Sequence, residues 1–399
     1  MSEESAAISR KILSLSVLPL GWGGDLKKGM PSVYFAQKGL VDSGYEVHYV
    51  TLGTRGEPQY ERQEGINIYR YFINFRPNKK RVLFTISAWL YWITIYLKIR
   101  ASVRQILKNV KPDIVIGHTF YCALPAYCIA RKLGVKCIFR EYGTMMLYDY
   151  VRAGFLKRLI RLYEVMAYKL PLSKYILTDD GSRTKDVAIL LGVPEKKIIF
   201  LKNGIFNSNE FHTQELPRDK VIIVTAARLN KYKNMDNIIR GFALSKSKKK
   251  AVLYVVGDGE MADELKQIAM EEGVACDVVF TGGLPRETVI GYFKASDIVI
   301  SMGSINPLLE SMACGKAIIT LDLGDTAKTV RHMENGILLK KRDHVYIAES
   351  IDLLVENTDL RNRLGKNAKE YVSKHFDTWN ERIKKEVGII SSAMRGDIK

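Results

Sequence analysis

The chain has 399 residues, of which 47% are hydrophobic and 26% charged, so it has room for two domains with buried cores and a globular composition. These values exclude a largely disordered, fibrous or repeat protein, and five irregularly spaced cysteines exclude a disulfide framework or a CxxC zinc site. The formal net charge of +18 is concentrated in the first half, because residues 1–210 hold 32 Lys and Arg against 17 Asp and Glu.

Short apolar runs alternate with segments of helical length through the first half of the chain. Continuous apolarity is typical of strands buried on both faces, in a parallel sheet covered by helices. The expected strands are 11–17, 46–51, 113–118, 135–141, 175–179 and 197–203. The expected helices are about 29–44, 83–109, 122–133, 155–170 and 181–191.

The same alternation restarts after a polar stretch at 207–219, which we interpret as a linker. Further strands are expected at 221–229, 251–259, 278–283, 297–302 and 317–321, and helices from about Val345 to a last amphipathic one at 375–390. The predicted fold is α/β, with two doubly wound parallel-sheet domains facing a cleft beyond their carboxyl strand ends. We expect domains at 1–210 and 211–375, with a C-terminal helix in 376–399 packing back on the first domain.

The stretch SMGSINPLLESMACGKAIITLD (301–322) carries the most specific pattern. A strand leads through a loop to a helix that Asn306 can cap, with Pro307 as first residue and Gly315 at its end. Free N–H groups and the positive dipole end make such a helix start a phosphate site, and Glu310, one turn in, can accept hydrogen bonds from a ribose diol. The alternative is a capped structural helix whose Glu310 faces solvent. The expected donor-binding residues here are Ser304, Ile305, Asn306, Pro307, Leu308 and Glu310.

Two basic residues follow the strand 221–229. Arg228 comes at its end and Lys233 five residues later, in ARLNKYKN. Both are expected at the same edge of the sheet, where two fixed cations can neutralise a diphosphate leaving group without a metal. An ordinary surface string remains the alternative, since Lys231 also lies there.

The first half offers weaker candidates. The loop LGWGGD follows the first strand, and Gly23 and Gly24 would let backbone approach a donor or acceptor, although a plain turn explains them equally well. His118 ends the strand 113–118, where a buried hydrogen-bonded histidine is the alternative. On the acceptor side, Arg140, Glu141 and Tyr142 follow at the end of 135–141, and we expect Arg140 or Glu141 to point into the cleft.

The segments ARLNKYKN, VVGDGEMADELK, VFTGGLPRETVIGYFKASDIVIS and NPLLESMACGKAII, in that order, resemble the C-terminal half of the retaining glycosyltransferases of family 4, which have the GT-B architecture. The resemblance spans about 11–392 and is strong over 221–340. It implies that Arg228 and Lys233 bind the donor diphosphate, that Glu310 holds the ribose, that Gly257 in the VVGDGE turn belongs to the donor site, and that His118 contacts the sugar hydroxyls.

Two residues depart from the family pattern, and one of them is Lys328, which stands where many members have a Glu after a Gly-Gly turn. Members often carry Glu-x7-Glu, and Met302 stands where the first carboxylate is expected, in a variant NPxLE form whose backbone amides are expected to take over the sugar contacts. No Asp-x-Asp occurs, so no metal or other cofactor is expected. The expected mechanism is front-side attack with the diphosphate stabilised by Arg228 and Lys233.

Residues 70–174 hold 20 basic side chains against four acidic ones, interleaved with aromatic residues. This mixture suits an anionic membrane surface, with a solvated basic face as the alternative; nucleic acid is not expected, because no recognition motif accompanies the charge. The longest apolar run, Val82–Leu97, is too short to span a bilayer, and the N-terminus lacks signal-peptide features.

We therefore expect a cytoplasmic enzyme, peripheral on the inner face of the cell membrane. It would move a sugar from a UDP- or GDP-sugar to a lipid-linked or glycan acceptor. The alternatives are a sugar-nucleotide 2-epimerase of the same fold and a degenerate, non-catalytic nucleotide-binding protein.

Overall fold

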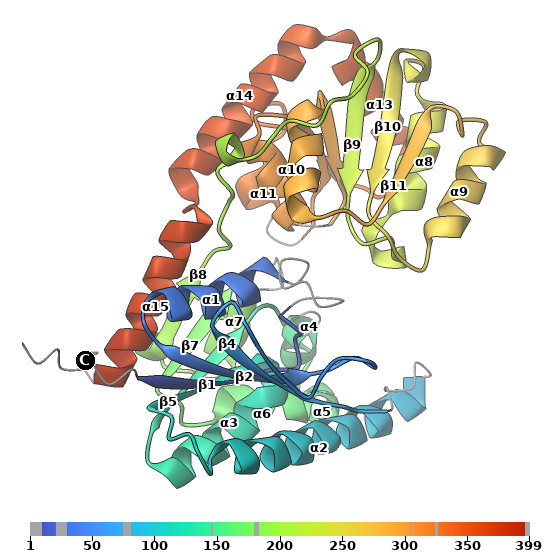
Figure 1. Ribbon diagram of the computed structural model, residues 1–399. Coiled ribbons are helices and arrows are strands. Elements are labelled where there is room, and N and C mark those ends of the chain that lie inside the picture. Colours follow the sequence, from blue (N-terminus) through green and yellow to red (C-terminus); the bar gives the residue numbers. More distant parts are fainter. Residues whose placement is uncertain are drawn as a thin grey trace, which may run out of the picture. The chain divides into compact units, whose positions relative to one another are not determined.

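The computed structural model describes residues 10–20, 30–74, 81–144, 147–178, 183–303, 305–323 and 326–395. The chain divides into two compact units: unit 1 comprises Met1–Lys202 and Asn380–Lys399, and unit 2 comprises Asn203–Trp379 (Figure 1). The boundary falls between Lys202 and Asn203, earlier than the expected boundary after residue 210, because the first residues of unit 2 pair with its last residues. The amide of Ile205 donates to the carbonyl of Asp377, and the amide of Trp379 donates to the carbonyl of Ile205, both at 3.0 Å.

Unit 1 contains an eight-stranded sheet in the order β3-β4-β2-β1-β5-β6-β7-β8. All neighbouring strands are parallel except β3 and β4. The strands are β1 (Lys11–Leu15), β2 (Glu46–Leu52), β3 (Tyr60–Gln63), β4 (Ile66–Tyr71), β5 (Ile114–His118), β6 (Lys136–Glu141), β7 (Lys174–Thr178) and β8 (Ile198–Leu201). The strand order reverses between β1 and β5, so the carboxyl ends of these two strands form the switch point at which such sheets bind ligands.

Helices cover both faces of this sheet, as continuous apolar strands require. On one face, α1 (Pro31–Asp42) and α15 (Trp379–Arg395) pack on side chains such as Ile116 and Ile138, and α15 contributes Ile390 and Ala393 to that core. The other face carries α2 (Arg81–Ile106), α3 (Thr119–Leu133), α4 (Leu147–Arg152), α6 (Leu162–Lys169) and α7 (Thr184–Leu190). The helix expected at 155–170 is divided at Arg161 into α5 (Phe155–Ile160) and α6.

The antiparallel pair β3–β4 has no counterpart among the expected strands. β3 reads Tyr-Glu-Arg-Gln and is largely exposed, so it lacks the apolar signal on which the expectation rests. A two-residue turn joins it to β4, with positive φ at Glu64 (48°) and Gly65 (84°). Two positive φ values match the twist of a tight hairpin. Such turns usually have the sequence Asn-Gly or Asp-Gly, whereas this one has Glu-Gly, so the usual sequence signal is missing.

Unit 2 contains a fully parallel six-stranded sheet in the order β11-β10-β9-β12-β13-β14. Its strands are β9 (Val221–Ala226), β10 (Ala251–Val256), β11 (Val278–Gly282), β12 (Ile298–Ser301), β13 (Ala317–Leu321) and β14 (Ile337–Leu339). The order reverses between β9 and β12, which defines a second switch point. The expected fold class, two doubly wound parallel α/β sheets, is confirmed.

Two helical layers bury this sheet as well (Figure 1). One layer holds α8 (Met235–Leu244), α9 (Ala262–Glu271) and α13 (His344–Glu356). The other holds α10 (Arg286–Ala295), α11 (Ile305–Ala313) and the second half of α14 (Thr358–His375); a short α12 (Thr326–Thr329) precedes β14.

Candidate functional site

The loops after β9 and β12 meet at the switch point of unit 2. A short 3-10 helix, Lys231–Lys233, follows β9 and is capped by Asn230, whose Oδ1 accepts the amide of Tyr232 at 3.2 Å. This turn directs Lys233 toward the neighbouring loop, where its Nζ donates to the carbonyl of Gly303 at 2.8 Å. The ammonium group therefore lies beside the loop that leads into the N-terminus of α11.

Arg228 lies on the same loop as Lys233 and is exposed. Two glycines of the loop after β10 pack against the backbone on either side of Arg228. A Cβ on Gly257 would lie 2.0 Å from the carbonyl oxygen of Ala227, and one on Gly259 would lie 2.3 Å from that of Leu229. The close approach permits hydrogen bonds from Ala227 N to Val256 O (3.1 Å) and from Leu229 N to Asp258 O (2.9 Å).

These bonds brace the loop on both sides of Arg228 without using its side chain. Gly257, which we expected in the donor site, thus has a packing function in the structure, and its donor contact stays a prediction.

The helix α11 begins at Ile305, two positions earlier than expected. Asn306 therefore lies inside its first turn instead of capping it, and its Oδ1 accepts a hydrogen bond from Nδ2 of Asn203 at 2.9 Å. Pro307 belongs to the same turn, Leu308 is buried in the core, and Gly315, with φ of 73°, follows the end of the helix as expected. Ser304, Gly23 and Gly24 lie outside the described residues.

Glu310 is buried, with 4% of the residue exposed, so the alternative in which it faces solvent is wrong. Its Oε1 accepts a hydrogen bond from Nη2 of Arg286, the first residue of α10. Burial raises the pKa of the Glu310 carboxyl, and the Arg286 charge opposes that effect. No sequence pattern singles out Arg286, because a basic residue after Pro285 is also common at an exposed helix start.

At the switch point of unit 1, His118 ends β5 and is 1% exposed. Its Nδ1 lies 2.8 Å from the hydroxyl of Tyr142, and its Nε2 lies 3.5 Å from Nε2 of Gln37 on α1. Burial and the nearby Arg140 charge lower the pKa of His118 to about 3, so the imidazole is neutral at physiological pH. The contact that the resemblance implies for His118, with sugar hydroxyls, stays a prediction.

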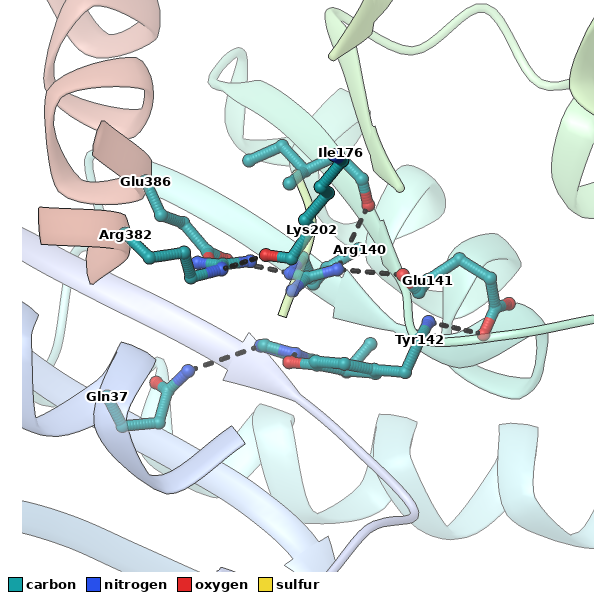
Figure 2. A network of polar contacts seen from close by, with 9 residues as sticks. Gln37, Arg140, Glu141, Tyr142, Ile176, Lys202, Arg382 and Glu386 are labelled. Atoms are coloured by element: carbon teal, nitrogen blue, oxygen red, sulfur yellow. Dashed lines mark hydrogen bonds and ion pairs between the residues drawn. The ribbon is translucent and has the colours of Figure 1, made fainter. Parts of the chain in front are cut away.

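Arg140 corrects one expectation. Its side chain is fully buried on the sheet face under α15, so it does not point into a cleft. Its Nε donates to Oε1 of Glu386 at 2.7 Å, its Nη1 donates to the carbonyl of Glu141 at 2.7 Å, and its guanidinium carbon lies 4.2 Å from the ring centre of Tyr142 (Figure 2). Arg382 donates to the other oxygen of Glu386. We call Arg140, Arg382 and Glu386 the α15 ion cluster.

Glu141 is 2% exposed and lies on the opposite face of the sheet from Arg140. Its carboxylate accepts the amide of Phe120, at the start of α3, at 3.0 Å and the amide of Tyr142 at 2.9 Å. Burial raises the pKa of the Glu141 carboxyl to about 8 despite these two hydrogen bonds. All three expected acceptor-side residues are thus buried inside unit 1, and an acceptor contact by Glu141 or Tyr142 stays a prediction.

Within the described residues, no group of three or more His, Cys, Asp or Glu side chains has an arrangement that would hold a metal ion. In the same part of the chain, no helix combines the length and the apolarity needed to cross a membrane.

Two doubly wound units, each with a switch point at the carboxyl ends of its strands, define a GT-B fold. The solved structures agree: sucrose-phosphate synthase of Thermosynechococcus elongatus superposes with a TM-score of 0.76 at 16% identity, covering 97% of this chain and 100% of that one. HepE of Anabaena in complex with UDP gives 0.69 at 16% identity, covering 96% and 100%.

Two family models match adjoining parts of the sequence. The model described as Glycosyltransferase Family 4 matches residues 32–206, and the model described as Glycosyl transferases group 1 matches residues 207–371. An uncharacterised glycosyltransferase of Methanocaldococcus jannaschii is 24% identical over 378 residues, 90% of this chain and 92% of its own. The chain belongs to the family 4 glycosyltransferases, and it is an enzyme of that class.

Proposed function

We propose that the protein transfers a sugar from a UDP- or GDP-sugar to a lipid-linked or glycan acceptor, with retention of the anomeric configuration and without a metal. The observation that carries this proposal is the position of Lys233, whose ammonium group lies 2.8 Å from the Gly303 carbonyl. Together with Arg228 it supplies two cations beside a helix N-terminus at a switch point, where a diphosphate binds best. The bound UDP of the structurally similar HepE supports a nucleotide donor.

The proposed reaction uses these charges in the transition state. The bond between the anomeric carbon and the diphosphate oxygen breaks as the acceptor oxygen attacks from the same face, and the acceptor proton passes to the departing diphosphate. Arg228 and Lys233 stabilise the negative charge that develops on that diphosphate.

The burial of Met302 supports a form of this reaction that does not use the first carboxylate. Its side chain is 4% exposed and belongs to the hydrophobic core of unit 2. The residue at this place therefore contributes to packing, while Gly303, with φ of 94°, turns the backbone toward α11. We propose that backbone amides of this loop contact the donor sugar.

The lipid acceptor is supported by the outer face of α2. Ile86, Leu90, Ile93 and Leu97 are between 43% and 61% exposed, and their spacing puts them on one side of the helix. We call these four residues the α2 apolar stripe. The exposed positions that follow include Lys98, Arg100, Arg104 and Lys108. An apolar stripe followed by basic residues suits insertion at an anionic lipid surface, and we propose that the enzyme works there, on the cytoplasmic face of the membrane.

A panel of UDP-, GDP-, ADP- and TDP-sugars tests the donor. A ligand at 100 times its Kd adds about 2.7 kcal/mol to the folded state, so the true donor raises the melting temperature. Slow hydrolysis of that donor is expected from a transferase. Isomerisation of the sugar would identify a 2-epimerase, and binding without turnover a non-catalytic protein.

Vesicle sedimentation tests the membrane surface. We expect binding to phosphatidylcholine vesicles that contain phosphatidylglycerol, and loss of binding when Leu90→Ser and Ile93→Ser are combined. Met270→Ser is the control, because Met270 is 64% exposed in unit 2. Equal binding by both variants would exclude the α2 apolar stripe as the contact.

A further inference from the structure

Glu310 and Arg286 form an ion pair at the proposed donor site, and nothing in the proposed function yet uses Arg286. The carboxylate is buried within α11, whereas the Arg286 side chain is 25% exposed at the start of α10. Arg286 is thus the more accessible partner of a carboxylate that is almost completely enclosed by protein.

The guanidinium of Arg286 is held by two contacts. Its Nη2 donates to Glu310, and its central carbon lies 5.2 Å from the ring centre of Phe206. A guanidinium has five N–H donors in a rigid fork, and the buried Nε of Arg286 finds no acceptor among the described residues. An unused buried donor costs free energy unless a further group accepts from it. The side chain is therefore fixed in place while part of its hydrogen-bonding capacity stays unused.

The carboxylate has complementary capacity. Arg286 bonds one oxygen of Glu310, and a carboxylate offers about four lone-pair sites in all. A ribose hydroxyl is both a donor and an acceptor, so one hydroxyl can donate to Glu310 and accept from Arg286. A neutral carboxyl would lose part of this acceptor strength, and the adjacent guanidinium favours the charged form.

We propose that Arg286 and Glu310 act together as the ribose-binding pair of the donor site, with Arg286 donating to the ribose 2′-hydroxyl that donates to Glu310. This inference rests on the proposed function, because it takes the ligand to be a ribonucleoside diphosphate. It assigns Arg286 to recognition of the ribose, separately from the diphosphate contacts of Arg228 and Lys233.

The test compares a nucleoside diphosphate with its 2′-deoxy analogue on the full-length protein. Kd values are measured by titration calorimetry for UDP and GDP, and the nucleotide that binds is paired with dUDP or dGDP. Since a hydrogen bond that involves a charged group is worth a factor of about 10 to 100, we expect the wild type to prefer the ribonucleotide by at least about tenfold. Arg286→Met should reduce this preference to less than about threefold while leaving 2′-deoxynucleotide binding nearly unchanged.

Two further variants make the test specific. Arg286→Lys keeps the positive charge but not the fork, so it should restore affinity only in part. Arg240→Met removes an ion pair with Glu272 elsewhere in unit 2 and should leave the preference unchanged. Melting curves of each variant report whether it is folded.

The outcomes separate the inference from the proposed function. If the wild type prefers the ribonucleotide and Arg286→Met or Arg286→Lys keeps that preference in full, the ribose-binding pair is wrong and the donor site stands. If the wild type binds neither nucleotide, the donor site itself is wrong, and the inference is overturned with it.

Discussion

Nε of Arg140 donates to Oε1 of Glu386 at 2.7 Å, although 246 positions separate these residues in the chain. Both side chains are at most 3% exposed, and Arg382 shares the same carboxylate. One buried carboxylate thus compensates two guanidinium groups, one from β6 and one from α15, and the contact attaches the last helix to the sheet of unit 1.

Replacing Glu386 by Gln should destabilise unit 1 strongly. The variant leaves Arg140 and Arg382 buried without a counter-charge, and breaking a buried pair in this way typically costs about 3–5 kcal/mol. Urea unfolding measures the loss. Glu334→Gln is the control, since its pair with Arg331 is more than half exposed, and a change below about 1 kcal/mol is expected there. Equal effects of the two substitutions would show that the α15 ion cluster contributes little to stability.

Because of Glu141, we expect the free energy of unfolding to depend on pH with the opposite sign to the effect of most carboxylates. Its pKa is raised to about 8 from an ordinary value of 4.5, so between these pH values the folded state binds the proton that the unfolded state has lost. This contribution to stability is therefore complete below pH 4.5 and is lost as the pH rises toward 8. Glu141→Gln removes the effect.

Urea unfolding of wild type and Glu141→Gln at pH 5 and pH 8 measures this difference. We expect the stability of the variant relative to wild type to increase between the two pH values. The exposed Glu287→Gln should show no such trend. A constant difference between Glu141→Gln and wild type would mean that Glu141 is ionised throughout.

His118 should remain neutral over the physiological range. Its pKa is lowered to about 3, mainly by burial, so its ring resonances in nitrogen-15 NMR spectra should not move between pH 5 and 8. Assignment follows from the signal lost in His118→Gln. A titration with a midpoint near 6.5 would show that the imidazole is accessible to water and that the contacts with Tyr142 and Gln37 do not enclose it.

Arg228→Ala and Lys233→Ala should each lower sugar transfer by about 10² or more, in the range of losing one charge-stabilising contact in a transition state. The measurement is the initial rate of product formation with the donor found by the nucleotide panel. Lys231→Ala is the matched control, since Lys231 is an exposed lysine of the same loop. Wild-type rates in both variants would refute the proposed diphosphate site.

The strand pattern predicted the fold because buried parallel strands are apolar on both faces. The apolar runs 221–229 and 251–259 correctly predict β9 and β10, although each strand ends earlier than its run. The hairpin β3–β4 was not predicted, because its first strand is polar and its turn is Glu-Gly. The hydrophobic pattern of a segment thus indicates whether it is buried, and it predicts exposed strands much less well.

The site was predicted unevenly for a related reason. Arg228, Lys233 and Glu310 follow from local spacing and from the family resemblance, and the structure places Lys233 and Glu310 on neighbouring loops and helices of one switch point. Arg140 was expected in a cleft because its partner, Glu386, lies far away in the sequence. A charged residue at a strand end looks the same from sequence whether it faces a ligand or a distant helix.

The position of α15 in unit 1 determines which of the two units is complete first during synthesis. Unit 2 lies within the chain between β8 and α15, so the ribosome delivers every residue of unit 2 before the helix that carries Glu386 and Ile390 emerges. Until then, Arg140 lacks its counter-charge and the sheet face is covered by α1 but not by α15, whereas unit 2 has all of its own residues. Unit 2 can therefore mature first, and the nascent first unit is the stretch that a chaperone would need to shield.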